Sequence, residues 1–358
     1  MHNYGNNIKI INIILIFIIF ICILYIRHLT LLIKKLETVD LSIIANKNVK
    51  DELLEMCYKS RSLYYSKERK LNETNLNTIQ QKLNFLMVHE SPDFKSKIAD
   101  KILLHDYSIK KLGFDLCVPI INIYNNSEQI KLEELPDKFV LKCNHGSGMN
   151  ILCNNKSKFD INNAKSLLNN WKNINYGLNN KEFQYLNIQR KIFSEIYLKD
   201  NIEDYKIYCF HGNPKFIRVQ KNLEGIKGKV NNYLIIYIFL QLIMLKTIIK
   251  KEINTFILYY NIFWKLTDIE TGLPGFYRKP EIIFEKPKNL NLMIDYAKKL
   301  SEDFVFVRVD FYNINGRIYL GELTFSPSNL CFHLKNREQS LELGKLIDLT
   351  RIKKNLFN

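Results

Sequence analysis

A chain of 358 residues is long enough for one large α/β domain or two smaller ones, each with its own hydrophobic core. Its seven cysteines are odd in number, scattered, and form no C-x-x-C pair, which excludes a disulfide scaffold and common zinc and redox motifs, so we expect buried, reduced thiols. The net charge of +16 suits an anionic partner, but no arginine-rich block or basic stripe is present, and nucleic acid is not expected as a partner.

The first apolar segment predicts a membrane anchor over residues 8–27. The seventeen residues from Ile10 to Ile26 carry no charge, and as a helix they would extend roughly 26 Å, close to the thickness of a bilayer core. No small-residue cleavage site follows, so we expect a retained single-pass anchor and not a signal peptide. Positive charges are Lys9 before the segment and Arg27, Lys34 and Lys35 after it, which predicts a cytoplasmic catalytic domain.

Residues 28–81 are polar and free of Pro and Gly, which indicates a helical stalk or linker. The region 82–136 then precedes the nucleotide-binding part. Within it, Phe94 to Leu112 has helical periodicity and ends at Gly113, as a helix with a glycine C-cap does.

Strands and helices alternate in the remaining chain, which predicts an α+β enzyme core. We expect helices at Ile161–Trp171 and Leu290–Leu300, and strands at Phe139–Cys143, Tyr205–Phe210, Lys215–Gln220, Phe304–Tyr312 and Ile318–Phe325.

A second apolar stretch interrupts this order at about residues 225–260. Residues 233–245 are almost wholly apolar, and the chain becomes apolar and aromatic again from Ile253 to Trp264. Thirteen apolar residues are too few to span a bilayer comfortably, so we expect a helical insertion that packs on the core or dips into the membrane surface, with a second crossing as the alternative.

The clearest chemical signal is a pair of acidic residues on two consecutive strands joined through Asn315-Gly316. A two-residue turn alone would place Asp310 opposite Gly321, whereas a three-residue loop that includes Arg317 would place Asp310 opposite Glu322. The second pairing leaves one clean apolar face, so burial favours it.

Opposed carboxylates repel unless a cation lies between them, and Mg²⁺ prefers oxygen ligands of this kind. Asp310 and Glu322 are therefore predicted metal ligands. The alternative is a solvated charged face on an edge hairpin.

Two further groups could bind a nucleotide. A short apolar strand carries Lys142 into the loop His145, Gly146, Ser147 and Gly148, whose backbone N–H groups could surround phosphate oxygens, although the glycines could equally form a hairpin turn. The segment Glu195, Ile196, Tyr197 and Leu198 could pair with adenine through backbone atoms, and Lys206 points the same way as Asp204 along its strand. The chain contains no G-x-x-x-x-G-K-[ST] sequence, which excludes the P-loop class.

Taken in order, these segments resemble the TupA-like ATP-grasp family, which is associated with bacterial capsule and teichuronopeptide biosynthesis. The resemblance runs from about Lys82 to Leu334. Its motifs are Lys97-Ile-Ala-Asp-Lys101, the block Leu135 to Gly148, Trp171 with Asn175-Tyr-Gly177, Asp204-Tyr-Lys206, Phe306-Val-Arg-Val-Asp310 and Gly321-Glu-Leu-Thr-Phe325.

The resemblance implies an ATP-grasp fold, in which two α+β subdomains (137–200 and 201–350) enclose ATP. It also implies roles for the candidate residues. Catalytic candidates are Lys142, Lys206 and Arg308; the ATP-binding candidates are Lys142, His145 to Gly148, Glu195 to Leu198 and Lys206; the magnesium ligands are Asp310, Glu322 and Thr324, the last standing where many ATP-grasp enzymes have Asn.

The implied function is an ATP- and Mg²⁺-dependent carboxylate–amine ligase of cell-surface polysaccharide biosynthesis, acting through an acylphosphate. The expected partners are ATP, an acidic glycan or uronic acid acceptor, an amine donor, and the membrane. Two alternatives remain. One is a glycosyltransferase of the same pathway, although no two Asp residues have D-x-D spacing. The other is an inactive, membrane-anchored assembly factor.

Overall fold

The structure, a computed structural model, describes residues 76–90, 92–180, 182–199, 202–222, 255–269, 283–327, 334 and 337–352. Within these ranges no helix is both long enough and apolar enough to cross a membrane. The predicted anchor (8–27) and nearly all of the predicted stalk (28–81) lie outside the described residues and stay predictions.

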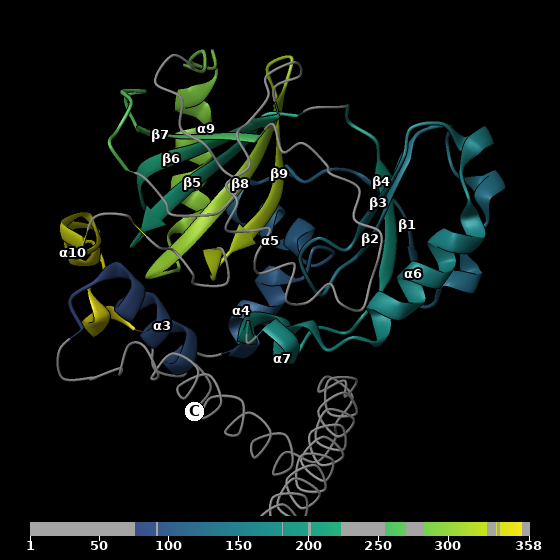
Figure 1. The fold of residues 1–358 in the computed structure, drawn as a ribbon, viewed down its shortest axis with the longest axis horizontal. Coiled ribbons are helices and arrows are strands. Elements are labelled where there is room, and N and C mark those ends of the chain that lie inside the picture. Colours follow the sequence, from purple (N-terminus) through teal and green to yellow (C-terminus); the bar gives the residue numbers. More distant parts are fainter. Residues whose placement is uncertain are drawn as a thin grey trace, which may run out of the picture.

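Two antiparallel sheets form the body of the protein, with α4 and α5 between them (Figure 1). The helices are α3 (Ile79–His89), α4 (Pro92–Ala99), α5 (Leu104–Leu112), α6 (Ile161–Asn173), α7 (Tyr176–Asn180), α9 (Leu290–Ser301) and α10 (Arg337–Lys345). The strands are β1 (Ile120–Tyr124), β2 (Phe139–Cys143), β3 (Asn150–Cys153), β4 (Ile192–Ile196), β5 (Asp204–Phe210), β6 (Asn213–Asn222), β7 (Thr255–Asn261), β8 (Phe306–Ile314) and β9 (Arg317–Thr324).

The small sheet has the strand order β1-β4-β2-β3. Along β2, Phe139, Leu141 and Cys143 are buried in a cluster that includes Leu168 of α6, so this face of the sheet is covered by that helix. Alternation along a strand sends Val140 and Lys142 to the opposite face. Strand β1 comes from the region predicted to precede the small subdomain, yet it pairs with β4 in the same sheet.

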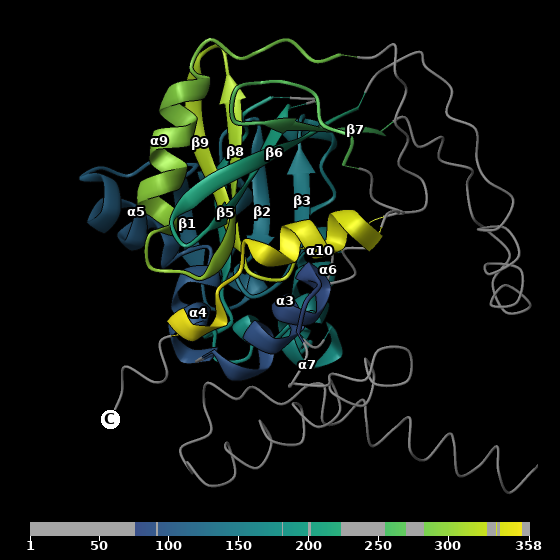
Figure 2. The ribbon, with the colours of Figure 1, turned by 90° about the vertical axis from the view of Figure 1, so that its left-hand side faces the viewer.

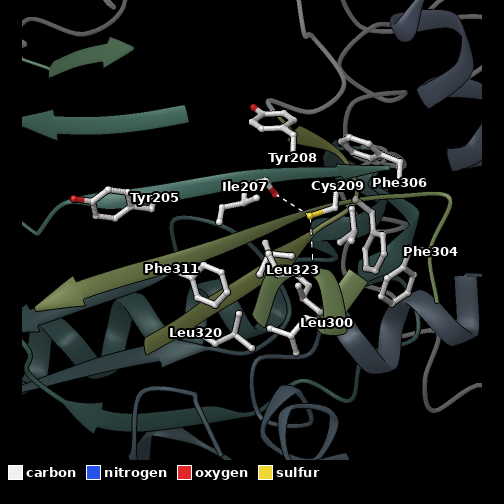
Figure 3. Close-up of a cluster of buried hydrophobic side chains, with 14 of the residues drawn as sticks. Tyr205, Ile207, Tyr208, Cys209, Leu300, Phe304, Phe306, Phe311, Leu320 and Leu323 are labelled. Carbon is white, nitrogen blue, oxygen red and sulfur yellow. Dashed lines mark hydrogen bonds between the residues drawn. The ribbon is translucent and has the colours of Figure 1, made fainter. Parts of the chain in front are cut away.

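The large sheet has the strand order β7-β6-β5-β8-β9. Its apolar face packs against α9, which runs alongside β8 and β9 (Figure 2). Figure 3 shows Ile207, Phe311 and Leu323 of this face near Leu300 of the helix, and these four side chains are almost fully buried. The opposite face carries buried aromatic side chains, such as Tyr208 and Phe216, together with the charged groups described below.

The predicted pairing of the acidic strands is confirmed, but the predicted loop is wrong. Asp310 is opposite Glu322, as expected from burial. However, Ile314 pairs with Arg317, so the turn has only two residues, and both Asn315 (φ 51°) and Gly316 (φ 84°) have positive φ, as a type I′ turn requires. A β-bulge shifts the register between Asp310 and Phe311 and leaves Gly321 without a partner, which restores the pairing.

The helix predicted from Phe94 to Leu112 is two helices, α4 and α5, with a break at residues 100–103. The cause is local. The Asp100 carboxylate accepts hydrogen bonds from the N–H groups of Ile102 (2.8 Å) and Leu103 (3.4 Å), which competes with helical hydrogen bonding. The predicted end at Gly113 is confirmed, with φ at 85° and its N–H bonded to the Ile109 carbonyl.

The helical insertion expected at about residues 225–260 is also wrong where the structure describes it, because Thr255–Asn261 is strand β7, paired along its length with β6. Ile257, Leu258, Tyr259 and Tyr260 are all buried, on both faces of the sheet. A strand buried on both faces is apolar throughout and shows no alternation, so it resembles a short buried helix in sequence. Residues 223–254 of the predicted insertion lie outside the described residues.

The expectation of buried, reduced thiols is confirmed for the cysteines that the structure describes, which are all free and buried: Cys117, Cys143, Cys153 and Cys209.

Candidate functional site

Charged side chains form a row across four strands on the polar face of the large sheet. Arg218 of β6 is opposite Lys206 of β5, Lys206 is opposite Asp310 of β8, and Asp310 is opposite Glu322 of β9. Because side chains at paired positions lie on the same face, the strand register alone brings these groups together. The Asp310 side chain is only 3% exposed, so the alternative of a solvated charged face is wrong.

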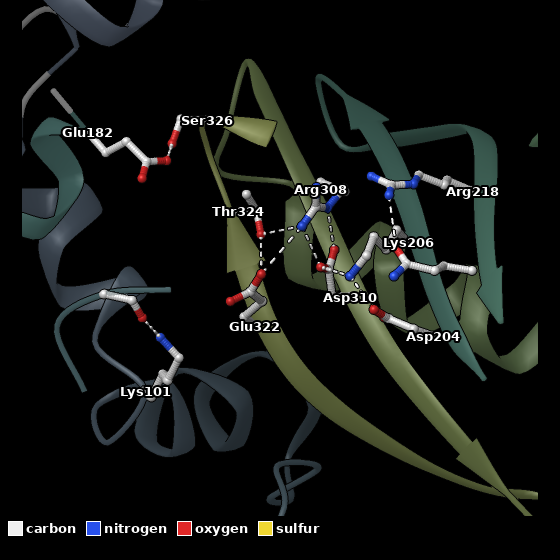
Figure 4. Close-up of polar contacts among 12 residues, drawn as sticks. Lys101, Glu182, Asp204, Lys206, Arg218, Arg308, Asp310, Glu322, Thr324 and Ser326 are labelled. Atoms are coloured by element: carbon white, nitrogen blue, oxygen red, sulfur yellow. Dashed lines mark hydrogen bonds and ion pairs between the residues drawn. The ribbon is translucent and has the colours of Figure 1, made fainter. Parts of the chain in front are cut away.

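Arg308 lies two residues before Asp310 and joins the row from the same face (Figure 4). Its guanidinium donates two hydrogen bonds of 2.6 Å to the Asp310 carboxylate, from Nε and Nη2. The same Nη2 is 3.3 Å from Glu322 Oε1 and 3.0 Å from Thr324 Oγ1. Arginine therefore supplies the cation that two opposed carboxylates need, a role that the sequence analysis gave to a metal.

The contacts of Arg308 also test whether these residues suit Mg²⁺. One nitrogen contacts oxygens of Asp310, Glu322 and Thr324, so the three predicted ligands converge around a single cationic group. All three are hard oxygen donors of the type that Mg²⁺ selects. The residues fit the ion, provided that Arg308 gives up part of its contact with the carboxylates.

The charges of the cluster favour the ionised forms of Glu322 and Lys206, whereas burial raises the pKa of Asp310. Burial alone would raise the pKa of Glu322, but Lys101, Arg308 and Lys206 outweigh it and lower that pKa to about 2. Burial would likewise lower the pKa of Lys206, yet Asp310 at 2.8 Å and the neighbouring Asp204 carboxylate raise it above the usual lysine value. Both groups are therefore ionised at neutral pH.

On the small sheet, Lys142 of β2 and Glu195 of β4 form an ion pair. Lys142 is opposite Phe193 and Val140 is opposite Glu195, so the two charged residues are diagonal neighbours on the face away from α6. The Lys142 and Glu195 side chains are 17% and 10% exposed, so both are close to the protein interior.

The remaining predicted nucleotide residues lie at the two ends of β2. The loop His145–Gly148 follows its last residue, while Ile196 is opposite Phe139 at its first. Tyr197 lies near Lys138, whose ammonium is 5.9 Å from the centre of the ring, and Leu198 follows it. At roughly 3.3 Å per residue, the strand separates these two groups by about 13 Å, with the Lys142–Glu195 pair between them.

The loop connects β2 to β3, so the hairpin reading of its glycines is confirmed. Two glycines are required for structural reasons. A Cβ on Gly146 would lie 2.8 Å from the ring of Tyr176, and Gly148 has a φ of 74°. His145 is buried, and its Nε2 is 3.2 Å from the Trp171 carbonyl oxygen, so it anchors the loop to α6.

Lys101, which the sequence analysis did not assign to the site, connects the two sheets. It follows the Asp100 break, and its ammonium donates to the Gly146 carbonyl oxygen in the loop. Burial lowers the pKa of Lys101, while the carboxylates of Glu322 and Glu195, one on each sheet, oppose that shift. In the sequence, only the position of Lys101 in the Lys97–Lys101 motif marks it as a candidate. The fold is needed to show that it lies near both Glu322 and Glu195.

A narrow cleft, with a free volume of only about 10 Å³, lies between the two sheets. Both sheets and the Lys101 turn contribute to its lining, which includes Lys101, Cys117, Lys142, Glu195, Leu320 and Gly321. Cys117 is also near His105 and Asp115, with ligand-type atoms of the three within 4.8 Å of one another. Their own hydrogen bonds account for this arrangement, since Asp115 accepts from the Cys117 N–H (2.9 Å) and contacts His105 Nδ1 (2.7 Å).

The structure thus brings the predicted residues together in two groups, one on each sheet, and Lys101 lies near an acidic residue of both. Lys206, Arg308, Asp310, Glu322 and Thr324 form one cluster, which extends to Asp204 and Arg218. Lys142 and Glu195 form the other. Ile196, Tyr197 and Leu198 belong to neither cluster, because they lie at the far end of β2 from the loop.

A known protein family matches most of the chain. The model of the TupA-like ATPgrasp family matches residues 81–225 and 230–348, which include both clusters, Lys101 and the loop. No curated protein matches the chain in sequence.

Solved structures resemble the chain at low identity. D-Alanine-D-alanine ligase from Helicobacter pylori is 14% identical, with a TM-score of 0.38 over 76% of this chain and 69% of that chain. N5-carboxyaminoimidazole synthetase from Staphylococcus aureus, complexed with ADP, is 15% identical, with a TM-score of 0.34 over 66% and 50%. The ATP-grasp ligase PsnB with its minimal precursor is 11% identical, with a TM-score of 0.33 over 66% and 54%. The chain spans about half the length of the last two proteins.

Proposed function

Because this chain belongs to the TupA-like ATP-grasp family, and so to the ATP-grasp ligase superfamily, we propose that it uses Mg-ATP to join a carboxylate to an amine through an acylphosphate. In this reaction the carboxylate oxygen attacks the γ-phosphorus of ATP, and ADP leaves. The amine nitrogen then attacks the acyl carbon, phosphate leaves, and the amine loses a proton. No side-chain nucleophile is required.

The observation that carries this proposal is the convergence of three oxygen donors on one cationic group, with Lys101 close enough to lower the pKa of one of them, Glu322. Asp310, Glu322 and Thr324 all contact Arg308 Nη2. Lys142 and Lys101 line the same cleft. Acidic ligands for a metal and cations for phosphates, held by different sheets, are the two parts that phosphoryl transfer needs.

The residues of this chain would act mainly by positioning. Asp310, Glu322 and Thr324 would hold Mg²⁺, which neutralises charge on the phosphates when bound. Lys142 would exchange its contact with Glu195 for a phosphate oxygen, and Lys101, whose pKa burial lowers, would regain a favourable charge partner in the nucleotide. Arg308 and Lys206 would stay beside the reacting groups and stabilise negative charge as it moves between oxygens.

The length of the small sheet supports the placement of ATP along β2. The His145–Gly148 loop and the Ile196–Leu198 segment lie about 13 Å apart at the two ends of that strand. A nucleotide whose base contacts one end and whose phosphates contact the other would pass the Lys142–Glu195 pair.

We further propose that the carboxylate is a uronic acid of a cell-surface polysaccharide, and that the enzyme works on the cytoplasmic side of a membrane through its N-terminal segment. The support is the net charge of +16, which suits an acidic glycan, the uncharged segment from Ile10 to Ile26, and the family assignment.

The test is ADP release by the full-length protein with Mg-ATP, uronic acids and a panel of amines. We expect release to need both substrates together, and mass spectrometry to show an amide product. Lys142→Ala should abolish the stimulated rate, whereas Lys158→Ala, at an exposed position that does not line the cleft, should not. If no uronate and amine pair stimulates ADP release, the substrate proposal is wrong; if the protein also fails to bind Mg-ATP, the ligase proposal is wrong with it.

A further inference from the structure

Tyr185 is an aromatic residue beside the His145–Gly148 loop. Its ring centre is 5.2 Å from that of Tyr176, edge to face, and Tyr176 in turn packs so closely on Gly146 that a Cβ there would lie 2.8 Å from its ring. The Lys101 ammonium lies 5.8 Å from the centre of the Tyr185 ring and also donates to the Gly146 carbonyl oxygen. Tyr185 is therefore held by the same two side chains that hold the loop.

The segment that carries Tyr185 is also fixed to the end of β9, the strand with the second acidic residue of the cluster. Tyr185 ends the short helix η5 (Phe183–Tyr185), and the residue before it, Gln184, donates a hydrogen bond of 2.5 Å to the Ser326 hydroxyl. Ser326 follows the last residue of β9 by two positions and donates to Glu182 (Figure 4). Side chains thus join the Tyr185 segment to the acidic strand, as well as to the loop.

The hydroxyl group of Tyr185 has no hydrogen bond to any residue that the structure describes, although Tyr185 is only 7% exposed. The hydroxyl is not fully enclosed either, because it keeps some accessible surface. Tyrosine hydroxyls in the interior of a protein usually find a hydrogen-bond partner. An unbonded hydroxyl that a small molecule can still reach indicates that a ligand or ordered water supplies the partner.

The surroundings of the hydroxyl decide what kind of ligand it can meet. Burial raises the pKa of Tyr185 well above its usual value, the carboxylates of Glu322 and Glu182 raise it further, and Arg308 lowers it. The phenol is therefore neutral at physiological pH and acts as a hydrogen-bond donor and not as a base. A donor that lies beside a predicted metal ligand and two cations, Arg308 and Lys101, is suited to an anionic oxygen.

We propose that the Tyr185 hydroxyl donates a hydrogen bond to the terminal phosphoryl group of ATP, which makes Tyr185 a further catalytic residue. This inference rests on the proposed function, in which that group lies between the His145–Gly148 loop and the acidic cluster. Tyr185 forms no covalent bond. Its fixed, neutral donor stabilises negative charge on a phosphoryl oxygen while the group passes from ADP to the carboxylate.

The test is equilibrium binding of two nucleotides to full-length Tyr185→Phe in the presence of Mg²⁺. One nucleotide is ADP, and the other is adenylyl imidodiphosphate, a non-hydrolysable analogue that keeps the terminal phosphate. We expect affinity for the analogue to fall by roughly 3- to 10-fold and affinity for ADP to stay unchanged, because only the analogue has the group that the hydroxyl contacts. Tm should not fall, because the hydroxyl has no protein hydrogen bond to lose.

Two further variants separate the hydroxyl from the ring and from general effects on stability. Tyr107→Phe is the matched control: its hydroxyl donates to the Leu300 carbonyl oxygen (3.0 Å) and to Asp303 (3.2 Å), on the α9 side of the large sheet. Its loss should lower Tm and leave both affinities unchanged. Tyr185→Leu removes the ring too, and it should weaken ADP binding as well, because Lys101 loses the ring over which it lies.

The outcomes distinguish this inference from the proposed function. If the unmodified protein binds neither nucleotide, the proposed function fails and the inference fails with it. If the unmodified protein binds both nucleotides and Tyr185→Phe loses affinity for neither, or equally for both, only the inference is overturned. Normal binding by Tyr185→Phe together with weak binding by Tyr185→Leu would overturn it too, because the ring alone would then matter.

Discussion

The two sheets hold their charged residues in different ways. On the large sheet each member of the acidic cluster has at least two partners: Asp310 contacts Arg308 and Lys206, and Glu322 contacts Arg308 and Thr324. On the small sheet Lys142 and Glu195 form one ion pair at the cleft. A network with several contacts per group is rigid and costly to break, whereas a single pair can exchange partners at little cost. Under the proposed function, the network on the large sheet would hold a cation in place, and the single pair on the small sheet would give way to a nucleotide.

The strongest test of this difference is Asp310→Asn. It removes the main carboxylate partner of both Arg308 and Lys206 in a buried setting, so we expect the free energy of unfolding to fall by about 3–5 kcal/mol. Magnesium-dependent ADP release should fall by about 100-fold or more, because a predicted metal ligand is lost as well. Urea unfolding and the ADP assay measure the two effects.

Glu322→Gln is the matched control for Asp310→Asn. Its side chain is 28% exposed, against 3% for Asp310, so the loss of stability should be clearly smaller while the loss of activity is similar. Equal stability of Asp310→Asn and the unmodified protein would show that the cluster is not the rigid network described here.

Lys142→Met should have a smaller and more selective effect. We expect nucleotide affinity to fall by roughly 10- to 100-fold, because a charge-assisted contact to phosphate is lost, with the unfolding free energy changed by no more than about 1–2 kcal/mol. Equilibrium nucleotide binding and urea unfolding are the measurements. Lys158→Met, at an exposed position that does not line the cleft, provides the comparison, and an equal loss of affinity in both variants would remove the special role of Lys142.

The pH dependence of nucleotide binding should report on Lys101, the residue between the two sheets. Burial lowers its pKa in the free protein, and a bound phosphate would raise it, so binding takes up a proton at pH values between the two. Affinity is then full below the pKa of the free protein and falls as pH rises through this window, by up to about tenfold per pH unit. Binding titrations from about pH 7 to 10 measure this slope. Lys101→Met should bind more weakly and lose the slope, and an unchanged slope would assign it to another group.

How far the sequence predicts this site depends on whether the information is local. The pairing of Asp310 with Glu322 was predictable because only one register buries all the apolar side chains of β8 and β9 on the same face. The type of turn was not predictable, because a three-residue loop and a two-residue turn followed by a bulge at Gly321 give the same alternation of side chains near the acidic residues.

Other features depended on contacts distant in sequence. Lys101 reaches Gly146, which is 45 residues away, and no pattern around either residue shows this contact. Strand β7 has the composition of a buried helix, and only its pairing with β6 decides between the two. The helix breaks at Asp100 because its carboxylate accepts hydrogen bonds from the Ile102 N–H and from the Asn144 side chain. The second of these is again a tertiary contact.

The smallest expected effects concern two glycines of the β8–β9 hairpin. Gly316 lies in the turn, and Gly321 lies at the bulge beside Glu322. Gly316 has a φ of 84° and open space around it, so Gly316→Ala should cost about 1 kcal/mol of stability and leave activity intact. At Gly321 a Cβ would lie 3.0 Å from the Tyr312 ring, so Gly321→Ala must displace that ring or reverse the bulge beside Glu322. We expect a similar loss of stability together with a several-fold rise in the Mg²⁺ concentration needed for half-maximal ADP release. Both variants remove the same conformational freedom from the same hairpin. If only Gly321→Ala raises the Mg²⁺ requirement, the bulge sets the geometry of the acidic pair. If the two variants behave alike, the bulge affects only the stability of the hairpin.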